Sequence, residues 1–480
     1  MQLKQQAIRG AKWVGTSRFV SAFLKFITTA VLARLLVPGD FGLMSMMLVV
    51  IGLAQTVADA GISNAIIYRQ DSTEDQLSSL YWLNLLSGMI LFLALLLLRP
   101  LVVAYFKEPR ISQYIPVLGI KFIVDSFGQQ FKVLLRKELK FNILSTIDIV
   151  AVVITTILTI LFAWLGFGVW SLVLQSILLS FLTSLAAFIW AVRSGNLPQV
   201  HFRFKDLDGY FQFGLFQMGE RFLNFFGANI DYLIIGRFLG ADLLGFYSLS
   251  YQLIKFPITQ LNPIINQVAF PAFSKLEEDQ VVRSWYKKIV KTLSTLIFPM
   301  LFGMVVVAPE FIEIVYGPEW LPAVPVIRIL CFVGALLAQG NPIGSLLLSR
   351  GRADLGFYWN VFGLVFMAVF NYLGVRWGIE GVAFSSLLVI ALIRFPGSFY
   401  LRWLVIRMRV MPYLKSLFTP TLGATLMLAL LVAIKPVWTG FSLLMGLSLQ
   451  IITGAIIYLA VIYVIDRKVI TDIRQILKFR

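Results

Sequence analysis

Charged side chains inside apolar stretches are the residues of this sequence whose types could do chemistry. Placing an Arg, Lys or Asp at the centre of a bilayer costs about 2.5–3.5 kcal/mol on insertion scales, so each such group needs a partner, a water-filled cavity or a function. The candidates are Arg18, Lys25, Asp59, Lys121, Asp125, Asp148, Glu220, Arg221, Asp231, Lys255, Arg328 and Arg394.

The basic members of this set predict binding of an anion. A guanidinium group presents a planar fork of donors that matches phosphate oxygens, and such contacts are strong where the dielectric is low. Arg18 and Lys25 are seven residues apart, about two helical turns, so a helix places them on one face. The alternative is that the cations pair with carboxylates and only hold helices together. We predict an anion-binding cavity formed by Arg18, Lys25, Arg221, Lys255 and Arg328.

The acidic members are candidates for coupling transport to an ion, either H+ or Na+. Burial and neighbouring charges together set whether a carboxylate holds a proton, and the sequence does not rank these effects. Lys121 and Asp125 are four residues apart and can neutralise each other on one helix surface, which favours a structural role for that pair. No other cofactor is predicted. The coupling candidates are Asp59, Asp125, Asp148, Glu220 and Asp231.

Prolines inside two predicted spans are candidates for gate elements. Pro257 and Pro263 lie in the eighth span, and Pro342 follows Gly340 and Asn341 in the tenth. Proline removes a helical hydrogen bond and clashes with the preceding turn. We therefore expect both helices to bend or break and to expose backbone groups where they line a cavity.

Membrane-spanning helices must position these groups. Of the 480 residues, 59% are hydrophobic and 14% are charged, about half the charged fraction of soluble domains. A hydrocarbon core about 30 Å thick needs about 20 mainly apolar helical residues per crossing. The predicted fold class is all-α integral membrane, with about 14 transmembrane helices. The predicted spans are 11–36, 41–67, 76–98, 111–135, 141–164, 169–192, 209–236, 243–270, 289–308, 321–348, 355–375, 381–401, 414–434 and 440–465.

The distribution of Lys and Arg predicts the orientation. Basic residues concentrate in the connections at 136–140, 193–205, 275–291 and 402–415, which fall on the side of both termini if the chain crosses fourteen times. The positive-inside rule then places both termini in the cytoplasm. The stretch 466–480 alternates apolar and basic residues at helical spacing, which predicts an amphipathic helix on the cytoplasmic membrane surface.

An internal repeat divides the chain. The segment LARLLVPGDFGLMS at 32–45 reappears as IGRFLGADLLGFYS at 235–248, and a shift of 203 aligns Arg34 with Arg237 and Gly42 with Gly245. The same shift relates Arg18 to Arg221, which predicts that the two arginines face each other across a pseudo-twofold axis. Because each bundle has six spans, the repeat is parallel and encloses a central cavity suited to alternating access. The predicted parts are an N-terminal six-helix lobe at 1–192, a cytoplasmic linker at 193–208, a C-terminal six-helix lobe at 209–401, and the last two helices with the tail at 402–480.

Composition and motifs exclude several other functions. The net charge of +17 is spread between spans rather than gathered in a patch with aromatic residues, so nucleic-acid binding is not expected. A single cysteine, Cys331, allows no intramolecular disulfide. His201 lies beside Arg203 and Lys205 and is expected to be a solvated loop residue. The sequence has no Walker A loop, GxSxG elbow or HExxH motif, and no extramembrane loop large enough for a catalytic site, so an enzyme is not predicted.

The chain resembles the polysaccharide flippases of the multidrug/oligosaccharidyl-lipid/polysaccharide exporter superfamily, in particular the branch of colanic acid and teichuronic acid exporters. The O-antigen exporters belong to the same family. The resemblance covers essentially the whole chain and depends on the order and spacing of short motifs. These are GAKW at 10–13, LARLLVPGDFG at 32–42, DAGI at 59–62, Asn262-Pro263 and Phe270-Pro271.

The resemblance implies a function. It implies movement of an undecaprenyl-diphosphate-linked oligosaccharide from the cytoplasmic to the outer leaflet of the bacterial inner membrane, with the diphosphate at the cavity cations. It also implies that the helices at 414–465 form a groove for the lipid tail, and that polysaccharide polymerase and assembly proteins are partners. The alternatives are an ion-coupled drug antiporter of the same superfamily, which the basic bias of the spans disfavours, and a lipid II flippase.

Overall fold

The protein is described by a computed structural model over residues 2–58, 66, 72–207, 211–276, 278–438 and 440–467. Within these residues the chain forms helices and connecting turns, with no β-strand. This agrees with the predicted all-α class. The predicted amphipathic helix lies mostly at 468–480, outside the described residues.

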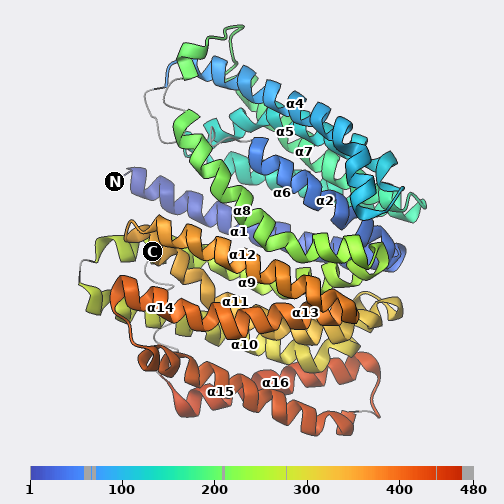
Figure 1. The fold of residues 1–480 in the computed structure, drawn as a ribbon, viewed down its shortest axis with the longest axis vertical. Coiled ribbons are helices and arrows are strands. Elements are labelled where there is room, and N and C mark those ends of the chain that lie inside the picture. The colour runs from blue at the N-terminus through green and yellow to red at the C-terminus, as the bar shows by residue number, and fades with distance from the viewer. Residues whose placement is uncertain are drawn as a thin grey trace. The chain divides into compact units, whose positions relative to one another are not determined.

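The chain divides into two compact units by which residues pack together, Met1–Gly245 and Phe246–Arg480. These units reflect packing, whereas the predicted lobes reflect a repeated sequence, and the lobe boundaries remain a prediction. Figure 1 shows α4, α5 and α7 of the first unit side by side. The helices of the first unit are α1 (Gln2–Leu35), α2 (Pro38–Ala58), α4 (Glu74–Phe106), α5 (Ile111–Lys137), α6 (Phe141–Trp164), α7 (Val169–Ser194), η1 (Phe204–Leu207) and α8 (Phe211–Phe238).

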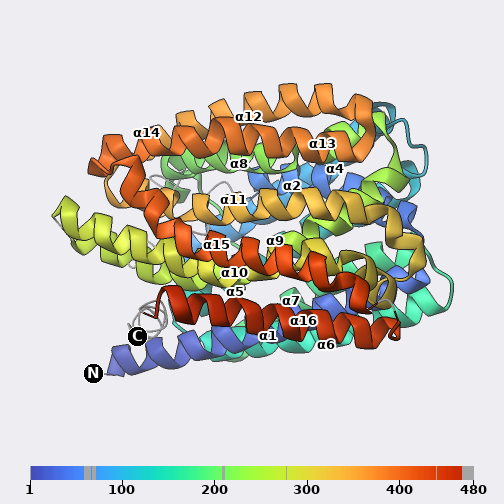
Figure 2. The same cartoon turned by 90° about the horizontal axis from the view of Figure 1, so that it is seen from below.

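The second unit begins inside α9 (Ala241–Lys275), whose first residues belong to the first unit. Its last two helices pack on α10 and on each other, as Figure 2 shows for α15 and α16. The further elements are α10 (Asp279–Val315), η2 (Pro318–Ala323), α11 (Val324–Ser349), α12 (Ala353–Gly374), η3 (Val375–Trp377), α13 (Gly378–Leu388), the π-helical turn η4 (Val389–Arg394), α14 (Phe395–Ile406), α15 (Val410–Ile434), η5 (Lys435–Trp438) and α16 (Leu443–Ile465).

Nine helical segments among the described residues are long and apolar enough to cross a membrane. One of them, Asp354–Ile406, contains α12 and the α13–α14 helix joined by the short turn η3. Four other long helices, α1, α5, α8 and α9, are not among the nine, and they carry most of the charged candidates named above. The chain is therefore a multi-pass membrane protein, and the count of fourteen spans stays a prediction.

Small residues bring the helices of the first unit into close contact. A Cβ atom on Gly88 of α4 would lie 2.7 Å from the Phe122 carbonyl oxygen of α5, and one on Gly128 of α5 would lie 2.6 Å from the Ser184 Cα of α7. Because lipid tails are as apolar as the helix surfaces, the hydrophobic effect does not drive membrane helices together, and they associate by such packing and by hydrogen bonds. Around these crossings Tyr81, Phe131, Ala187 and Ala191 form a buried core.

The two copies of the sequence repeat meet each other at their glycines. A Cβ on Gly42 would lie 2.6 Å from the carbonyl carbon of Ala241, and a Cβ on Gly245 would lie 2.6 Å from the carbonyl carbon of Pro38. Pro38 and Ala241 are themselves related by the shift of 203. The two contacts are thus exchanged by the repeat, which places a local twofold axis between the starts of α2 and α9.

Two prolines in α10 leave backbone carbonyls that neighbouring helices satisfy. Pro299 has no N–H for the Thr295 carbonyl, and the Tyr458 hydroxyl of α16 donates to that oxygen at 2.9 Å. Pro309 likewise frees the Val305 carbonyl, which accepts from Arg328 Nε of α11 at 3.2 Å. These side chains allow α10 to continue through both prolines, because a freed carbonyl in an apolar environment needs a donor.

The candidate gate prolines do not break their helices, and the expected bend stays a prediction. The helix α9 runs unbroken from Ala241 to Lys275 across Pro257 and Pro263, and α11 runs unbroken across Pro342. Each proline removes a single backbone hydrogen bond, which neighbouring bonds and packing tolerate in a long membrane helix. A role of these prolines as gate or hinge stays a prediction, and the side chain of Pro263 lies outside the described residues.

Candidate functional site

Helix α1 presents a cationic face at the middle of its length. Its opposite face packs on α6, where Thr28 Oγ1 lies 3.0 Å from Thr156 Oγ1 and Ser17 Oγ donates to the Ser145 carbonyl at 3.4 Å. Arg18 and Lys25 are both exposed, and within the described residues neither side chain has an ion pair or hydrogen bond. The structure thus keeps both cations away from the packed face of α1, on the shared face that their spacing predicts.

Helix α8 carries the second predicted arginine. Arg221 is partly buried and has interactions within the protein. Ten residues later, Asp231 is only 3% exposed, and its Oδ1 accepts from the Tyr232 backbone N–H at 3.0 Å. The predicted opposition of Arg18 and Arg221 stays a prediction. Two coupling candidates, Asp59 and the side chain of Glu220, lie outside the described residues.

Lys121 and Asp125 form the ion pair that their spacing predicts. The Lys121 Nζ lies 2.6 Å from Asp125 Oδ2 and 2.7 Å from Ser180 Oγ of α7. Gln55 of α2 donates to the same carboxylate oxygen at 3.3 Å. Three helices therefore converge on this pair, and Asp125 is held by a cation rather than alone in a cavity.

A second lysine of α5, Lys132, makes polar contacts that were not predicted from the sequence. Its Nζ lies 2.9 Å from Thr183 Oγ1 and 3.2 Å from Ser184 Oγ, both on α7. Lys132, Arg136 and Lys25 are all close enough to act electrostatically on Asp148 of α6. The spacing of Lys121 and Lys132, eleven residues or about three helical turns, was the available signal for a common face.

The remaining predicted cations of the cavity lie in the second unit and have local partners. Lys255 of α9 stacks on the Tyr251 ring, with 4.1 Å from Nζ to the ring centre. Arg328 of α11 is exposed, but its Nε donates a hydrogen bond to the Val305 carbonyl, which Pro309 leaves without its helical donor. This contact gives Arg328 a structural role, and a role in anion binding stays a prediction for both residues.

The polar linker folds back on the start of α4. The Gln199 backbone N–H donates to Ser78 Oγ at 2.9 Å, and the Trp82 indole donates to the Gln199 carbonyl at 2.9 Å. His201 is not a solvated loop residue, because its Nε2 lies 2.9 Å from Asp206 Oδ2 and it is only partly exposed. The Ser79 hydroxyl donates to the same carboxylate at 2.9 Å, and these hydrogen bonds hold the pKa of Asp206 below its usual value.

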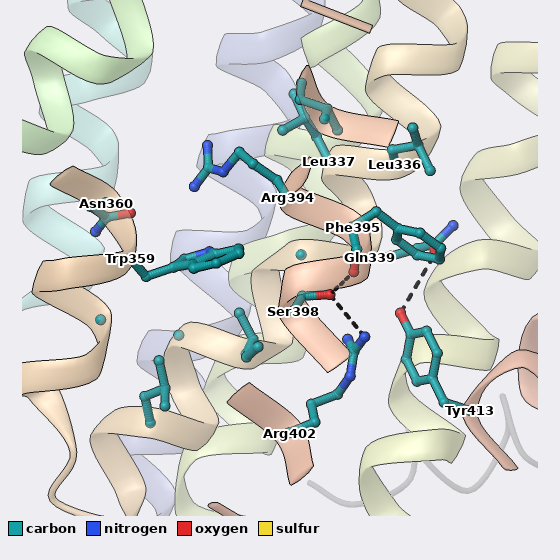
Figure 3. Close-up of a pocket in the computed structure, with 16 residues that line it drawn as sticks. Leu336, Leu337, Gln339, Trp359, Asn360, Arg394, Phe395, Ser398, Arg402 and Tyr413 are labelled. Atoms are coloured by element: carbon teal, nitrogen blue, oxygen red, sulfur yellow. Dashed lines mark hydrogen bonds between the residues drawn. The ribbon is translucent and has the colours of Figure 1, made fainter. Parts of the chain in front are cut away.

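A cavity of about 280 Å³ lies inside the second unit. Figure 3 shows its polar lining, with Arg394 and Arg402 from the α13–α14 helix, Asn360 from α12 and Gln339 from α11. The full lining is Leu336, Leu337, Gln339, Gly340, Ile343, Gly344, Leu347, Gly356, Trp359, Asn360, Ile390, Arg394, Phe395, Ser398, Arg402 and Tyr413. The cavity therefore combines two guanidinium groups with amides and apolar walls, and none of its sixteen lining residues is acidic.

Arg402 corrects a sequence expectation, since it was assigned to the basic cytoplasmic linker. It lies within α14 and is only 1% exposed. Its guanidinium stacks on the Tyr413 ring at 3.8 Å and on the Phe399 ring at 4.9 Å, and its Nη2 donates to Ser398 Oγ at 2.8 Å. Aromatic faces attract a cation, and this attraction offsets part of the cost of burial. The sequence signal was the recurrence of Arg394, Ser398 and Arg402 at intervals of four.

The fold and these polar contacts define a class of protein: a polytopic helical membrane protein with buried cationic groups. Comparison with known proteins gives its family. Residues 31–325 match the family model of polysaccharide biosynthesis proteins. The teichuronic acid biosynthesis protein TuaB of Bacillus subtilis (strain 168) is 34% identical, over 95% of this chain and 95% of its own. The lipopolysaccharide biosynthesis protein WzxC of Escherichia coli (strain K12) is 35% identical, over 81% of this chain and 79% of its own.

The chain belongs to this polysaccharide biosynthesis protein family, as the sequence motifs predict. Its fold is also found among solved structures. A solved structure of the lipid II flippase MurJ, in an inward closed conformation, superposes with a TM-score of 0.75 at 14% identity and covers 95% of this chain and 99% of that one. At this identity the similarity concerns the fold alone.

Proposed function

We propose that the protein is a flippase that moves an undecaprenyl-diphosphate-linked oligosaccharide from the cytoplasmic to the outer leaflet during surface polysaccharide synthesis. It acts in the bacterial inner membrane with both termini in the cytoplasm. Membership of the family supports this reading, as do the names of its relatives. The observation that carries the mechanism is the pair of exposed cations, Arg18 and Lys25, on one face of α1.

The diphosphate is the group that these cations recognise. A guanidinium and an ammonium on one helix face offer charge-assisted hydrogen bonds to phosphate oxygens, which are about twice as strong as neutral ones. The sugar then remains in the aqueous cavity, and the lipid tail remains in the bilayer. Polysaccharide polymerase and assembly proteins are the proposed partners that receive the product.

Release to the outer leaflet requires the outer end of the transporter to open. The predicted topology places the connection between α1 and α2 on the outer side, and the reciprocal glycine contact of Gly42 and Gly245 lies there. In the proposed cycle this contact closes the outer side while substrate enters, and it parts for release. A ligand that binds one state more tightly shifts the population toward that state.

Substitution of Arg18 tests the proposed substrate contact. We expect Arg18→Ala to lose at least about tenfold of flipping activity, because one charged hydrogen bond is worth roughly 1.5–3 kcal/mol. Arg18→Lys should retain part of the activity. Flipping of a lipid-linked oligosaccharide is measured in proteoliposomes, together with surface polysaccharide in a strain that lacks the transporter. Arg376→Ala, at an exposed arginine of η3, is the matched control. Normal flipping by Arg18→Ala would remove the cationic face from the mechanism.

We also propose that a proton or sodium gradient drives the cycle through a carboxylate of the first unit. Asp148 of α6 is the described candidate chosen for the test, because Lys132, Arg136 and Lys25 lie near enough to interact with it electrostatically. Imposed H+ and Na+ gradients in proteoliposomes should change the initial rate, and Asp148→Asn should abolish this dependence while Asp125→Asn preserves it. A rate indifferent to both gradients contradicts ion coupling.

A further inference from the structure

The cavity of the second unit has an uncompensated positive charge. Arg394 and Arg402 line it, and no ion pair that the structure describes includes either residue. Burying a charge without a counter-charge costs several kcal/mol even after relaxation. The aromatic rings around Arg402 offset this cost for one guanidinium only. The other guanidinium, that of Arg394, is partly exposed and has no ion pair among the described residues.

Arg394 is the group aimed into this space. It ends the π-helical turn η4, and in Figure 3 no dashed line joins its guanidinium to another of the residues drawn. Its position is defined by packing, since a Cβ on Gly363 of α12 would lie 3.0 Å from its Cζ. A π-helical turn is rare and often occurs at functional positions. Its guanidinium, with five N–H donors, thus lies against α12 in the wall of a cavity whose lining has no carboxylate.

The second cation is held at a fixed place in the same lining. Ser398, four residues from each arginine, accepts from Arg402 and is itself anchored by donating to the Phe395 carbonyl. The Tyr413 hydroxyl, beside the Arg402 guanidinium, donates to Gln339 Oε1 at 3.4 Å. The polar wall of the cavity is thus organised before any ligand arrives.

From this geometry we propose that the cavity is a binding site for a phosphate-type oxyanion, with Arg394 as its principal ligand and Arg402 as the second charge. The space suffices, because about 280 Å³ compares with about 10–15 Å³ of cavity needed for one water. The site lies within the second unit alone and is distinct from the α1 cations that the proposed function uses.

The surroundings favour a lipid phosphate as the source of this oxyanion. An apolar groove of about 590 Å³ adjoins the cavity and shares Leu336, Gln339 and Phe395 with its wall. The cavity lies toward the ends of α11 and α14 and the starts of α12 and α15, which the predicted topology places at the cytoplasmic leaflet. That leaflet is rich in anionic lipids in many membranes. A soluble phosphate ion is the other possible source of the oxyanion.

The test measures binding to the purified full-length protein and does not depend on flipping. In detergent, sodium phosphate is titrated while thermal unfolding is followed, because a ligand of the folded state raises the unfolding temperature. In nanodiscs of phosphatidylcholine with or without phosphatidylglycerol, native mass spectrometry counts retained anionic lipids. The variants are Arg394→Gln and Asn360→Asp, the second adding a carboxylate to the cavity without removing an arginine. Arg376→Gln is the control.

We expect phosphate or phosphatidylglycerol to bind the wild type and the control alike, and to bind both cavity variants at least about tenfold more weakly. Retention of phosphatidylglycerol by the wild type identifies a lipid source, whereas a response to phosphate alone identifies a soluble one; either result supports the site. Equal binding by Arg394→Gln and Arg376→Gln overturns the proposal, as does the absence of binding by the wild type to both probes.

Discussion

The reciprocal glycine contact gives the sharpest test of how the repeat works. Gly42 of α2 and Gly245 of α9 each approach the backbone of the other copy, at Ala241 and Pro38. Adding a single methyl group at either glycine, as Gly42→Ala or Gly245→Ala, places a carbon where a backbone carbonyl now lies. The substitution is small, and both positions are helical, so its effect isolates the close approach.

The magnitude follows from the distance. The added Cβ would lie 2.6 Å from a carbonyl carbon, whereas carbon atoms in contact are normally about 3.5–4.0 Å apart. The carbonyl oxygen would lie closer to the added Cβ than the carbonyl carbon does, so the two backbones must separate by more than about 1 Å. Overpacking of this kind costs about 1–3 kcal/mol, which shifts an equilibrium between contact and separation by about 5–150-fold. We expect each alanine to favour the separated state by that factor.

Disulfide cross-linking between Gly39→Cys and Asp242→Cys reports the contact. A Cβ on Gly39 would lie 3.4 Å from Asp242 Cγ, so the two positions face each other closely enough for a cross-link to report their approach. The one native cysteine, Cys331, is buried and contributes little background. The cross-linking rate should fall by about 5–150-fold in the Gly42→Ala background and remain unchanged with Gly15→Ala, because nothing lies within 4 Å of a Cβ at Gly15.

The double variant distinguishes a shared contact from two separate ones. Once Gly42→Ala has separated the backbones, Gly245→Ala meets an opened contact, so the two effects should not add. A wild-type cross-linking rate in Gly42→Ala refutes the close approach. A double variant whose free-energy change is the sum of the single changes refutes the reciprocal arrangement.

Two further predictions concern stability and pH. Tyr458→Phe should lower the free energy of unfolding by about 1–3 kcal/mol, because it leaves the Thr295 carbonyl freed by Pro299 without a donor; thermal unfolding is compared with Tyr463→Phe at an exposed tyrosine of the same helix, and equal stability of the two variants contradicts this role. Docking of the linker on α4 should be pH-dependent through Asp206, whose pKa is lowered first by the Ser79 hydroxyl and then by His201. Because the carboxyl pKa is lower in the docked state, docking is stabilised at pH values above the ordinary pKa of about 3.9. This stabilisation is lost as the pH falls through the lower pKa of the docked state. Pepsin should therefore cleave within 196–207 only below about pH 4 in the wild type, and at a higher pH in Ser79→Ala. A release pH that is the same in both proteins would exclude this hydrogen bond.

The sequence predicted several helices closely, because their signal is local, whereas α4 and α10 extend well beyond the predicted spans 76–98 and 289–308. An apolar run of sufficient length must be helical in a membrane, since backbone groups there have no other partners. The predicted spans 111–135, 141–164 and 169–192 correspond to α5, α6 and α7 within two residues. The ion pair of Lys121 and Asp125 was also readable, since both residues lie on one helix.

The contacts between helices could not be predicted from the sequence in the same way. A bend or a break was expected at Pro257, Pro263 and Pro342, and the break did not occur, because neighbouring bonds and packing decide whether a membrane helix tolerates proline. Arg328 was predicted to bind an anion, but it donates a hydrogen bond to a backbone carbonyl of α10. Only the packing of α10 on α11 brings this side chain and the carbonyl together.

By itself the sequence determined the fold class, the family and a repeat with paired glycines. Length and hydropathy act along one helix, and a repeat is a property of the chain. Only the tertiary structure showed that Gly42 and Gly245 touch the backbone of each other's copy, and that Arg402 lies buried under Tyr413 instead of in a cytoplasmic loop. Both results depend on which side chains from distant segments share one place, and spacing along the chain does not fix that.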